Sequence, residues 1–585
     1  MTAFIRLVDF NSSEEKEKEF FNQKNKFSIN TQDDFFKIPG SPIAYWVSEK
    51  VRHIFLKSET IGKIADVKVG MHTGNNDLFL RLWFEIEIIK MGLNIQNQGT
   101  LNESEYKWLP YNKGGEYRKW YGNNNFMVNW YKNGVDIHKY NNVPMTYRGA
   151  PVRAKEYFFR KNLTWSFVSS SSFGVRYTPE GFIFDVGGSS LFPKEIQLLN
   201  YISAFLCCNI AFTFLKTVNP TMNFQVENIK SLPIIFPKNQ ETRQKIDKLA
   251  QQNIDISCEE WDSRETSWDF KKNELLSHKT SGRLKDAYNN YCSYWKDKFQ
   301  KLHANEEELN LIFIDIYDLA DELTPDVPLK DVTILKDESE IKDGKLVFER
   351  EVIIKQFISY AVGCIFGRYS PDKPGLILAN QGETIHDFRE MVPDASFMPD
   401  EDNIIPILEA EYFQDDIVSR FREFLKLTFG KESLAENLEF IAGALSKSKK
   451  GESPEKVIRD YFLKSFFKDH VKMYKKRPIY WLFTSGKGKG FNALVYMHRY
   501  DKETLAKMRT DYLLELEAKI DARIEMLGDE ADVEKGRLGK QVKELMDYDA
   551  VLNNKALQML QRAEIDLDDG VVVNYAKFEG LVEKI

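Results

Sequence analysis

The sequence contains few cysteines and few histidines, and neither residue type is spaced for a metal site. Its five cysteines form no CxxC pair, and its eight histidines show no HxH or HxxxH spacing. Because zinc sites are usually built from such local ligand pairs, we expect no metal in this chain. An odd number of scattered thiols is typical of a reducing compartment, so we expect a cytoplasmic protein.

Long hydrophobic runs are also missing. The most apolar stretch, residues 201–215, is interrupted by Asn209 and is shorter than the ~18 apolar residues that a membrane-spanning helix needs. It predicts a buried helix. The first twenty residues become acidic before an apolar core could form, so they do not resemble a secretory signal. We therefore expect no contact with a membrane.

Catalytic motifs are absent as well. The stretch "TSGKGKGFN" at 484–492 is rich in glycine and lysine, but neither Lys487 nor Lys489 is followed by the Ser or Thr of a phosphate-binding loop. The stretch "DVGGSS" at 185–190 follows an apolar run without the GxGxxG pattern. A basic surface turn and a tight turn explain the two stretches. We expect no catalytic residue and no cofactor-binding residue in this chain.

The apolar content is sufficient for packed cores, since 43% of the 585 residues are hydrophobic and 13% are aromatic. Short apolar runs broken by Gly, Asn and Ser predict strands, and apolar steps of three and four predict helices. The fold class is α+β and multidomain. We expect a polar linker at 1–47, a β-rich domain at 48–237, a mainly helical region with an acidic insert at 238–501, and a helical hairpin with a C-terminal tail at 502–585.

Positive charge is concentrated in two places, although the whole chain carries −7. Residues 106–161 hold eleven Lys and Arg against three Asp and Glu, which gives 11 − 3 = +8, and aromatic and Asn residues lie between them. A second block at 471–499 holds seven Lys and Arg and no acid. Cations for phosphates and amides for base edges indicate DNA binding. The alternative is an aromatic-cored β-domain whose basic face has no ligand.

A polar turn at 70–77, "GMHTGNND", precedes the apolar run that begins at Leu78. Gly74 suits a turn position with positive φ, and the side chains of Thr73, Asn75 and Asn76 can cap neighbouring backbone groups. Two interpretations stay open: a contact on the phosphate side of DNA, or a structural turn at the entrance of the β-rich domain.

Several long segments resemble a known family. They are "IPGSPIAYWVS", "VKVGMHTGNNDLFLRLWFEI", "EEWDSRETSWDF", "LIFIDIYDLADELTP", "RPIYWLFTSGKGKGFNALVYMHRYDKETLAKMRTDY" and "DDGVVVNYAKF". Together they are similar to the C-terminal half of PglX, the adenine-specific DNA methyltransferase family of the BREX phage-exclusion systems. The first part of the match resembles the target-recognition domains of fused restriction-modification enzymes.

The resemblance implies that 48–237 is the DNA target-recognition domain and that 1–47 links it to a methyltransferase domain. It implies double-stranded DNA as a partner, positioned through phosphate contacts and read through base contacts. The residues that we expect to contact DNA are Thr73, Asn75, Asn76, Lys113, Arg118, Lys119, Asn123, Asn124, Arg153, Lys155, Ser169, Ser170, Lys475, Lys476 and Arg477.

The methyltransferase half of that family carries a Gly-rich S-adenosylmethionine loop and an Asn-Pro-Pro-Tyr motif. No two prolines are adjacent in this sequence, so we expect S-adenosylmethionine to be a cofactor of the full enzyme and not of this chain. Three hypotheses follow: a DNA-binding specificity module, a subunit that is active only with a catalytic partner, or a scaffold for other BREX proteins or a phage inhibitor that mimics DNA.

Overall fold

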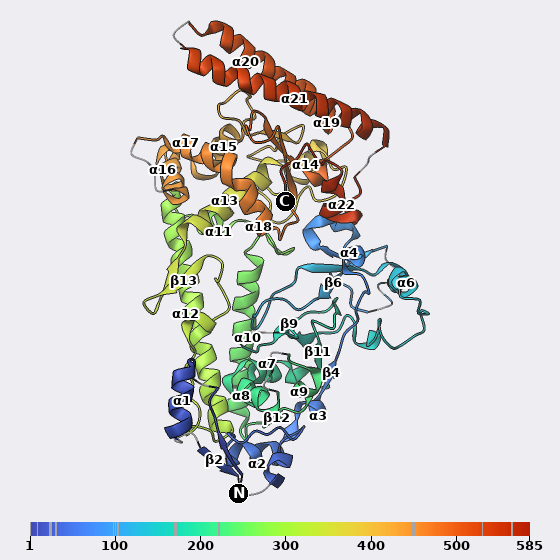
Figure 1. The fold of residues 1–585 in the computed structure, drawn as a ribbon, viewed down its shortest axis with the longest axis vertical. Helices are drawn as coiled ribbons and strands as arrows, with labels where there is room; N and C mark the ends of the chain where they lie inside the picture. The colour runs from blue at the N-terminus through green and yellow to red at the C-terminus, as the bar shows by residue number, and fades with distance from the viewer. Residues whose placement is uncertain are drawn as a thin grey trace. The chain divides into compact units, whose positions relative to one another are not determined.

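The computed structural model describes the chain except residues 1, 9, 23–25, 30–31, 98, 100, 102–104, 169–171, 220, 222, 447–450, 529–530 and 563–564. The chain forms two compact units. Unit 1 contains Met1–Asn76, Gly92–Trp261 and Lys298–Ile334, and unit 2 contains Asp77–Met91, Asp262–Asp297 and Leu335–Ile585. Both units mix helices with small sheets (Figure 1), which confirms the α+β, multidomain fold. The functional boundaries at 47, 237 and 501 stay predictions, because the units are discontinuous in sequence.

Two sheets form the β-rich part of unit 1. In the first, β6 (Trp108–Asn112) pairs antiparallel with β7 (Phe126–Asn129) and parallel with β10 (Ile183–Phe184). The second is antiparallel in the order β4 (Ala65–Lys68), β11 (Ser190–Pro193), β8 (Asn162–Thr164) and β9 (Arg176–Thr178). The rings of Phe184 and Phe192 lie 5.4 Å apart and are buried, so aromatic side chains of both sheets share one core.

The apolar stretch at 201–215 forms two short helices rather than one. Helix α7 (Leu199–Cys207) and helix α8 (Asn209–Val218) are largely buried, which confirms the prediction of a buried element. No single helix among the described residues has the length and apolarity to cross a membrane, and only this bent pair, with 72° between its halves, meets those criteria jointly.

Helix α2 (Glu49–Lys57) follows Ser48, the first residue of the predicted β-rich domain. Its N-cap is Ser48, whose Oγ accepts a hydrogen bond from the backbone N–H of Val51 at 3.1 Å. Further along the chain, α9 (Val226–Lys230) precedes β12 (Pro233–Ile234), which pairs with β3 (Glu59–Thr60). The end of the β-rich segment therefore returns to its beginning.

The first 47 residues form structure of their own, which the sequence pattern does not predict. Strand β1 (Thr2–Ile5) pairs antiparallel with β2 (Lys26–Ile29), and α1 (Ser13–Asn22) lies between them in sequence. The ring of Phe4 stacks on that of Tyr45 at 4.6 Å. Phe4 and Tyr45 lie about forty positions apart and belong to no helical or strand period. Their packing therefore leaves no local pattern in the sequence, and the polar composition of the segment predicts a linker.

Unit 2 is mainly helical and contains a three-stranded sheet and a two-stranded hairpin, in which β13 (Ser339–Lys342) pairs antiparallel with β14 (Lys345–Phe348). The buried helix α13 (Arg350–Ile365) packs with α15 (Ile417–Phe429) and α16 (Leu434–Leu445). The sheet has the order β15 (Ile404–Pro406), β17 (Asn492–Tyr496) and β16 (Tyr480–Thr484), all antiparallel.

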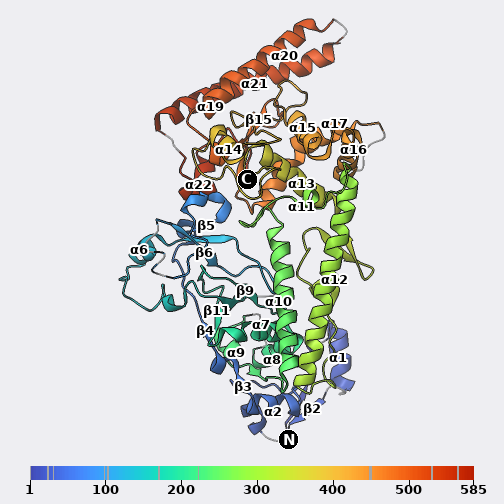
Figure 2. The same cartoon turned by 180° about the vertical axis from the view of Figure 1, so that it is seen from behind.

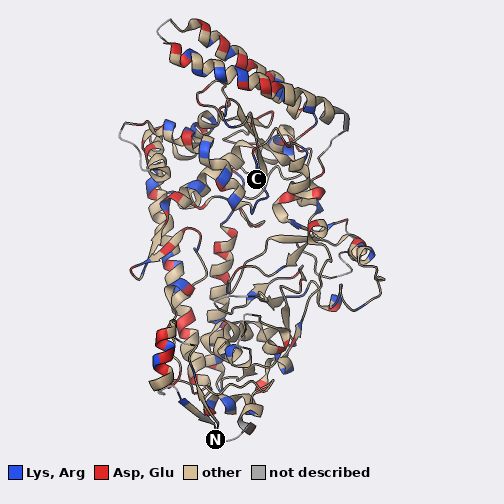
Figure 3. Ribbon diagram, viewed as in Figure 1, with Lys and Arg blue, Asp and Glu red and all other residues tan. Residues whose placement is uncertain are grey.

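The helical hairpin near the C-terminus is confirmed. Helix α20 (Leu514–Met526) packs against α21 (Asp532–Arg562). Arg523 pairs with Glu534 near the turn, and Arg509 pairs with Asp549 farther from it, which fixes the antiparallel direction. The buried stripe consists of Leu505, Met508, Tyr512, Leu516, Ile520, Leu538, Leu545 and Leu552. Figure 3 shows acidic and basic residues interleaved along both helices.

Candidate nucleic-acid interface

The turn at 70–76 is held from inside unit 1. The backbone N–H of Met71 donates to the carbonyl of Phe184, and that of Val186 donates to the carbonyl of Met71, both at 3.0 Å. A Cβ on Gly70 would collide with the Phe184 carbonyl oxygen. Close backbone approach therefore explains this glycine.

The polar side chains of the same turn are used locally. Thr73 is buried, and its Oγ1 donates to Oδ1 of Asn76 at 2.8 Å, while its carbonyl accepts from Asn141 Nδ2 at 2.9 Å. Gly74 has the positive φ expected of it, 82°. Asn75 is half-buried and Asn76 is exposed. These contacts favour a structural turn, and of the three DNA contacts predicted in it Asn75 and Asn76 keep exposed surface whereas Thr73 does not.

Lys113 joins two strand ends. Its Nζ lies 2.8 Å from Oδ2 of Asp185, which also accepts from the Tyr111 hydroxyl at 2.7 Å. Burial and the neighbouring carboxylate raise the pKa of Tyr111, so the hydroxyl stays a donor. The other oxygen of Asp185 accepts the Gly187 backbone N–H at 2.7 Å. Lys113 is thus part of a network that closes the first sheet.

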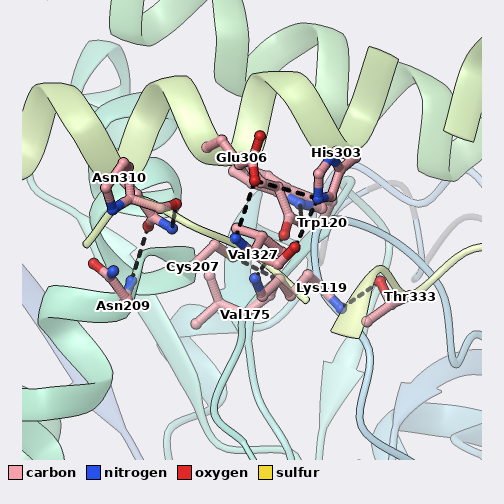
Figure 4. Close-up of polar contacts among 12 residues, drawn as sticks. Lys119, Trp120, Val175, Cys207, Asn209, His303, Glu306, Asn310, Val327 and Thr333 are labelled. Atoms are coloured by element: carbon pink, nitrogen blue, oxygen red, sulfur yellow. Dashed lines mark hydrogen bonds and ion pairs between the residues drawn. The ribbon is translucent and has the colours of Figure 1, made fainter. Parts of the chain in front are cut away.

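Lys119 forms a buried ion pair with α12 (Leu284–Ile316). Its Nζ lies 2.8 Å from Oε2 of Glu306, and the indole N–H of Trp120 donates to the other Glu306 oxygen at 2.7 Å (Figure 4). Although burial opposes a charged amine, Glu306 and further neighbours keep the pKa of Lys119 above its ordinary value. The Lys119 side chain is 10% exposed and that of Glu306 is 2% exposed, so a structural role explains Lys119 better than a phosphate contact.

Arg118 is held in a similar way. Its guanidinium pairs with Glu260 of α10 (Gln240–Asp262), donates to the carbonyl of Tyr121 at 2.6 Å and lies 5.1 Å from the Trp261 ring. With 14% of its side chain exposed, Arg118 also supports the fold. Arg118 and Lys119, both expected to contact DNA, therefore tie the basic segment to the long helices α10 and α12.

The predicted base readers are placed in turns. Asn123 adopts a positive φ of 63° and its Nδ2 donates to the Glu116 carbonyl at 2.9 Å. Asn124 is buried, with 3% exposure. The turn explains Asn123, because Asn tolerates the left-handed region, and burial leaves Asn124 little surface for a base contact. Ser169 and Ser170 lie outside the described residues.

Lys155 contacts its own segment. Its Nζ lies 2.8 Å from Nε2 of His138 and donates to the Met145 carbonyl at 3.1 Å. Burial lowers the pKa of Lys155, and burial together with the nearby ammonium lowers that of His138, which stays a neutral acceptor.

The second basic block lies in unit 2 and divides into exposed and buried members. Lys475 and Lys476 are exposed at the end of α18 (Phe467–Met473), and Arg477 lies 3.9 Å from Glu85. Arg499 is buried and donates to the Asp400 carbonyl at 2.9 Å. Lys475, Lys476 and Arg477 stay predicted DNA contacts, whereas Arg499 belongs to the core.

A basic hollow remains in unit 1. A cavity of about 540 Å³ is lined by the cations Lys68, Arg153 and Lys230 and by the acids Glu156 and Glu227, together with apolar residues such as Phe167 and Val226. Nε of Arg153 is buried and has no hydrogen-bond partner among the described residues. Lys68 lies 4.7 Å from the Tyr157 ring, and Lys230 pairs with Glu227 at 2.7 Å. We call this cavity, with its three cations Lys68, Arg153 and Lys230, the basic hollow.

Of the hollow's cations, the sequence indicated only Arg153. Lys68 ends strand β4 and Lys230 ends helix α9, about 85 and 77 positions from Arg153. Neither lies in a basic run, so no local signal marks them. The pairing of β4 with β11 and the packing of α9 on β4 bring them together.

Exposed cations continue along α6 (Tyr131–Tyr140) and the segment after it. In the basic segment, Lys132, Lys139, Arg148, Arg160 and Lys161 are exposed. Figures 1 and 2 place α6 at the margin of unit 1, on the side opposite α12, and Figure 3 shows basic residues on it. The basic hollow and this margin are the two groups of cations in unit 1 that are placed to attract a polyanion.

One carboxylate cluster of the described chain has ligand atoms close enough for a metal ion. Asp400, Asp402 and Asp415 have oxygens within 4.8 Å of one another. The Tyr512 hydroxyl oxygen lies 2.8 Å from Oδ2 of Asp402 and 2.5 Å from Oδ2 of Asp415, within hydrogen-bond distance of both. Burial, followed by repulsion from Asp402, raises the pKa of Asp400, which favours the protonated form of that carboxyl group.

Comparison with known proteins bears on the identity of the chain. No family model matches it. It is 39% identical over 608 residues, which include all of the chain, to the "Adenine-specific methyltransferase BrxX" of Escherichia coli O9:H4 (strain HS). It is also 39% identical over 604 residues to the "Adenine-specific methyltransferase PglX" of Lacticaseibacillus casei (strain Zhang), with 98% of the chain covered. The resemblance to PglX is confirmed. The chain spans 48% of the length of each of these relatives, as expected for similarity to one half of a PglX-type methyltransferase.

Proposed function

We propose that the chain is the double-stranded DNA recognition portion of a PglX-type, adenine-specific methyltransferase. The observation that carries the proposal is the basic hollow, which lies in the unit that holds most of the predicted target-recognition domain. The similarity to adenine-specific methyltransferases along the whole chain supports it. A chain with a net charge of −7 needs such a local basic surface to attract a polyanion.

The chemistry of the hollow suits phosphate better than base edges. Lys68, Arg153 and Lys230 present ammonium and guanidinium donors around an open cavity. Guanidinium groups can grip two phosphate oxygens at once, and ammonium groups act as point charges. The hollow would therefore fix the position of the duplex, and other side chains of unit 1 would read the sequence.

Equilibrium binding of a mixed-sequence duplex tests the proposal. We expect wild-type chain to bind it, and the triple variant Lys68→Ala, Arg153→Ala, Lys230→Ala to bind at least about tenfold more weakly, because each lost phosphate contact removes a counterion-release term. Lys301→Ala, an exposed cation of α12 in the same unit, is the matched control and should leave the affinity unchanged. Equal affinities for the wild type and the triple variant would refute the hollow as the contact.

A second candidate is a subunit that methylates DNA only with a catalytic partner. The half-length match to methyltransferases favours it. Incubation with S-adenosylmethionine and DNA distinguishes the two hypotheses. If the chain is only a specificity module, no mixture transfers a methyl group. If it is a subunit of a split enzyme, methyl transfer occurs when the polypeptide that matches the other half of the relatives is added. Turnover by the chain alone would contradict both.

A scaffold for other BREX proteins or for a DNA-mimic inhibitor is the remaining alternative. If the chain is a scaffold, its affinity for duplex DNA should be low and independent of salt concentration, because a protein partner and not phosphate covers the basic surface.

A further inference from the structure

Helix α6 begins with a strained backbone turn. Three successive residues, Lys132, Asn133 and Gly134, adopt left-handed conformations with φ values of 46°, 64° and 76°. Side chains with a Cβ rarely occupy this region, and consecutive examples are rarer still. A Cβ on Gly134 would lie 2.6 Å from Cζ3 of Trp130, so glycine is required where the turn meets the core.

The core holds this turn from the inside. Trp130, Ile137 and His138 are buried with 1%, 0% and 2% exposure. The ammonium of Lys155 lies 2.8 Å from His138 and ties the chain after α6 to the helix. Strained turns persist only where the surroundings determine them, and such strain is concentrated at functional sites. The turn therefore has a fixed outer face.

That outer face carries aromatic rings beside cations. Tyr131, Tyr140 and Tyr147 are 39%, 49% and 46% exposed. In the same stretch, residues 131–148, Lys132, Lys139 and Arg148 are exposed and Asp136 is the one acid. We call this stretch the tyrosine arm.

The arm is also connected to the turn at 70–76. Nδ2 of Asn75 donates to the Tyr140 hydroxyl at 3.4 Å. Asn75 thus helps to position an exposed ring.

We propose that the tyrosine arm stacks against unpaired bases of the DNA that the basic hollow holds. Aromatic rings interleaved with cations are the chemistry of sites for unstacked nucleotides, because rings stack on any base while cations accompany the backbone. An acidic or apolar protein surface would not need three rings each followed or preceded directly by a cation, as Tyr131–Lys132, Lys139–Tyr140 and Tyr147–Arg148 are. The inference rests on the proposed function, and it adds a second kind of contact to the phosphate contacts of the hollow.

Two DNA probes of identical sequence test it, one fully paired and one with a single unpaired base in the middle. We expect wild-type chain to prefer the probe with the unpaired base by about tenfold, the size of one stacking interaction. The variant Tyr131→Ala, Tyr140→Ala, Tyr147→Ala should lose the preference and keep its affinity for the paired probe. The matched variant with Phe at the three positions should keep the preference, since the ring stacks without its hydroxyl. A circular dichroism spectrum equal to that of the wild type shows that the Ala variant is folded.

The outcomes separate the two proposals. Paired DNA bound without preference for the unpaired base, or a preference that the Ala variant retains, would overturn the tyrosine arm and leave the basic hollow intact. Absence of binding to either probe would overturn both.

Discussion

The buried pair of Lys119 and Glu306 allows a sharp test of what the basic segment does. Replacing Lys119 with Met keeps a side chain of similar length and removes the charge. The Glu306 carboxylate, 2% exposed, then keeps the Trp120 indole as a hydrogen-bond donor but has lost its counter-charge. Removing one partner of a buried pair costs about 3–5 kcal/mol, because the other charge stays desolvated.

For a unit of this size that loss corresponds to a fall of about 6–10 °C in the melting temperature of unit 1. Thermal unfolding followed by circular dichroism measures it. The double variant Lys119→Met, Glu306→Gln should recover much of the loss, since the isolated charge is gone. DNA affinity measured below the transition should be the same in all three proteins.

Two results would refute this reasoning. One is a Lys119→Met variant that melts like the wild type, which would mean that the pair contributes nothing. The other is a Lys119→Met variant that is as stable as the wild type but binds DNA more weakly, which would mean that Lys119 contacts a DNA phosphate.

Two further predictions concern stability. Burial raises the pKa of Glu265 to about 7 from 4.5, so the contribution of Glu265 to stability is fully present below about pH 4.5, declines as the pH rises through 7, and is lower by about 3 kcal/mol above that pH. Glu265→Gln should abolish that fall in urea unfolding at pH 5 and pH 8, and the exposed Glu241→Gln should not; an unchanged pH profile in Glu265→Gln contradicts the prediction. Gly70→Ala should cost about 1–3 kcal/mol because the new Cβ collides with a backbone carbonyl, whereas Gly536→Ala, with open space in α21, should stabilise by about 1 kcal/mol. Equal effects of the two glycine substitutions would contradict the close approach at Gly70.

The features that the sequence predicts well depend on neighbouring residues. The apolar stripe produces the hairpin of α20 and α21, and Gly74 has a positive φ. In both cases the physical cause lies within a few positions along the chain, where periodicity and turn chemistry act.

The features that it does not predict depend on distant partners. Lys119 meets Glu306 across 187 positions, and Arg118 meets Glu260 across 142. A run of cations in the sequence does not show which of them the fold will neutralise. The same distance hides Lys68 and Lys230, which join Arg153 only after β4 and α9 pack together.

The salt dependence of duplex binding tests the central claim most directly. The logarithm of the association constant should fall linearly with the logarithm of salt concentration, and the slope should be shallower by about 2–3 in the triple variant of Lys68, Arg153 and Lys230, since three phosphate contacts are lost. The Lys301→Ala control should have the wild-type slope. Identical slopes for wild type and triple variant would contradict DNA recognition through the basic hollow.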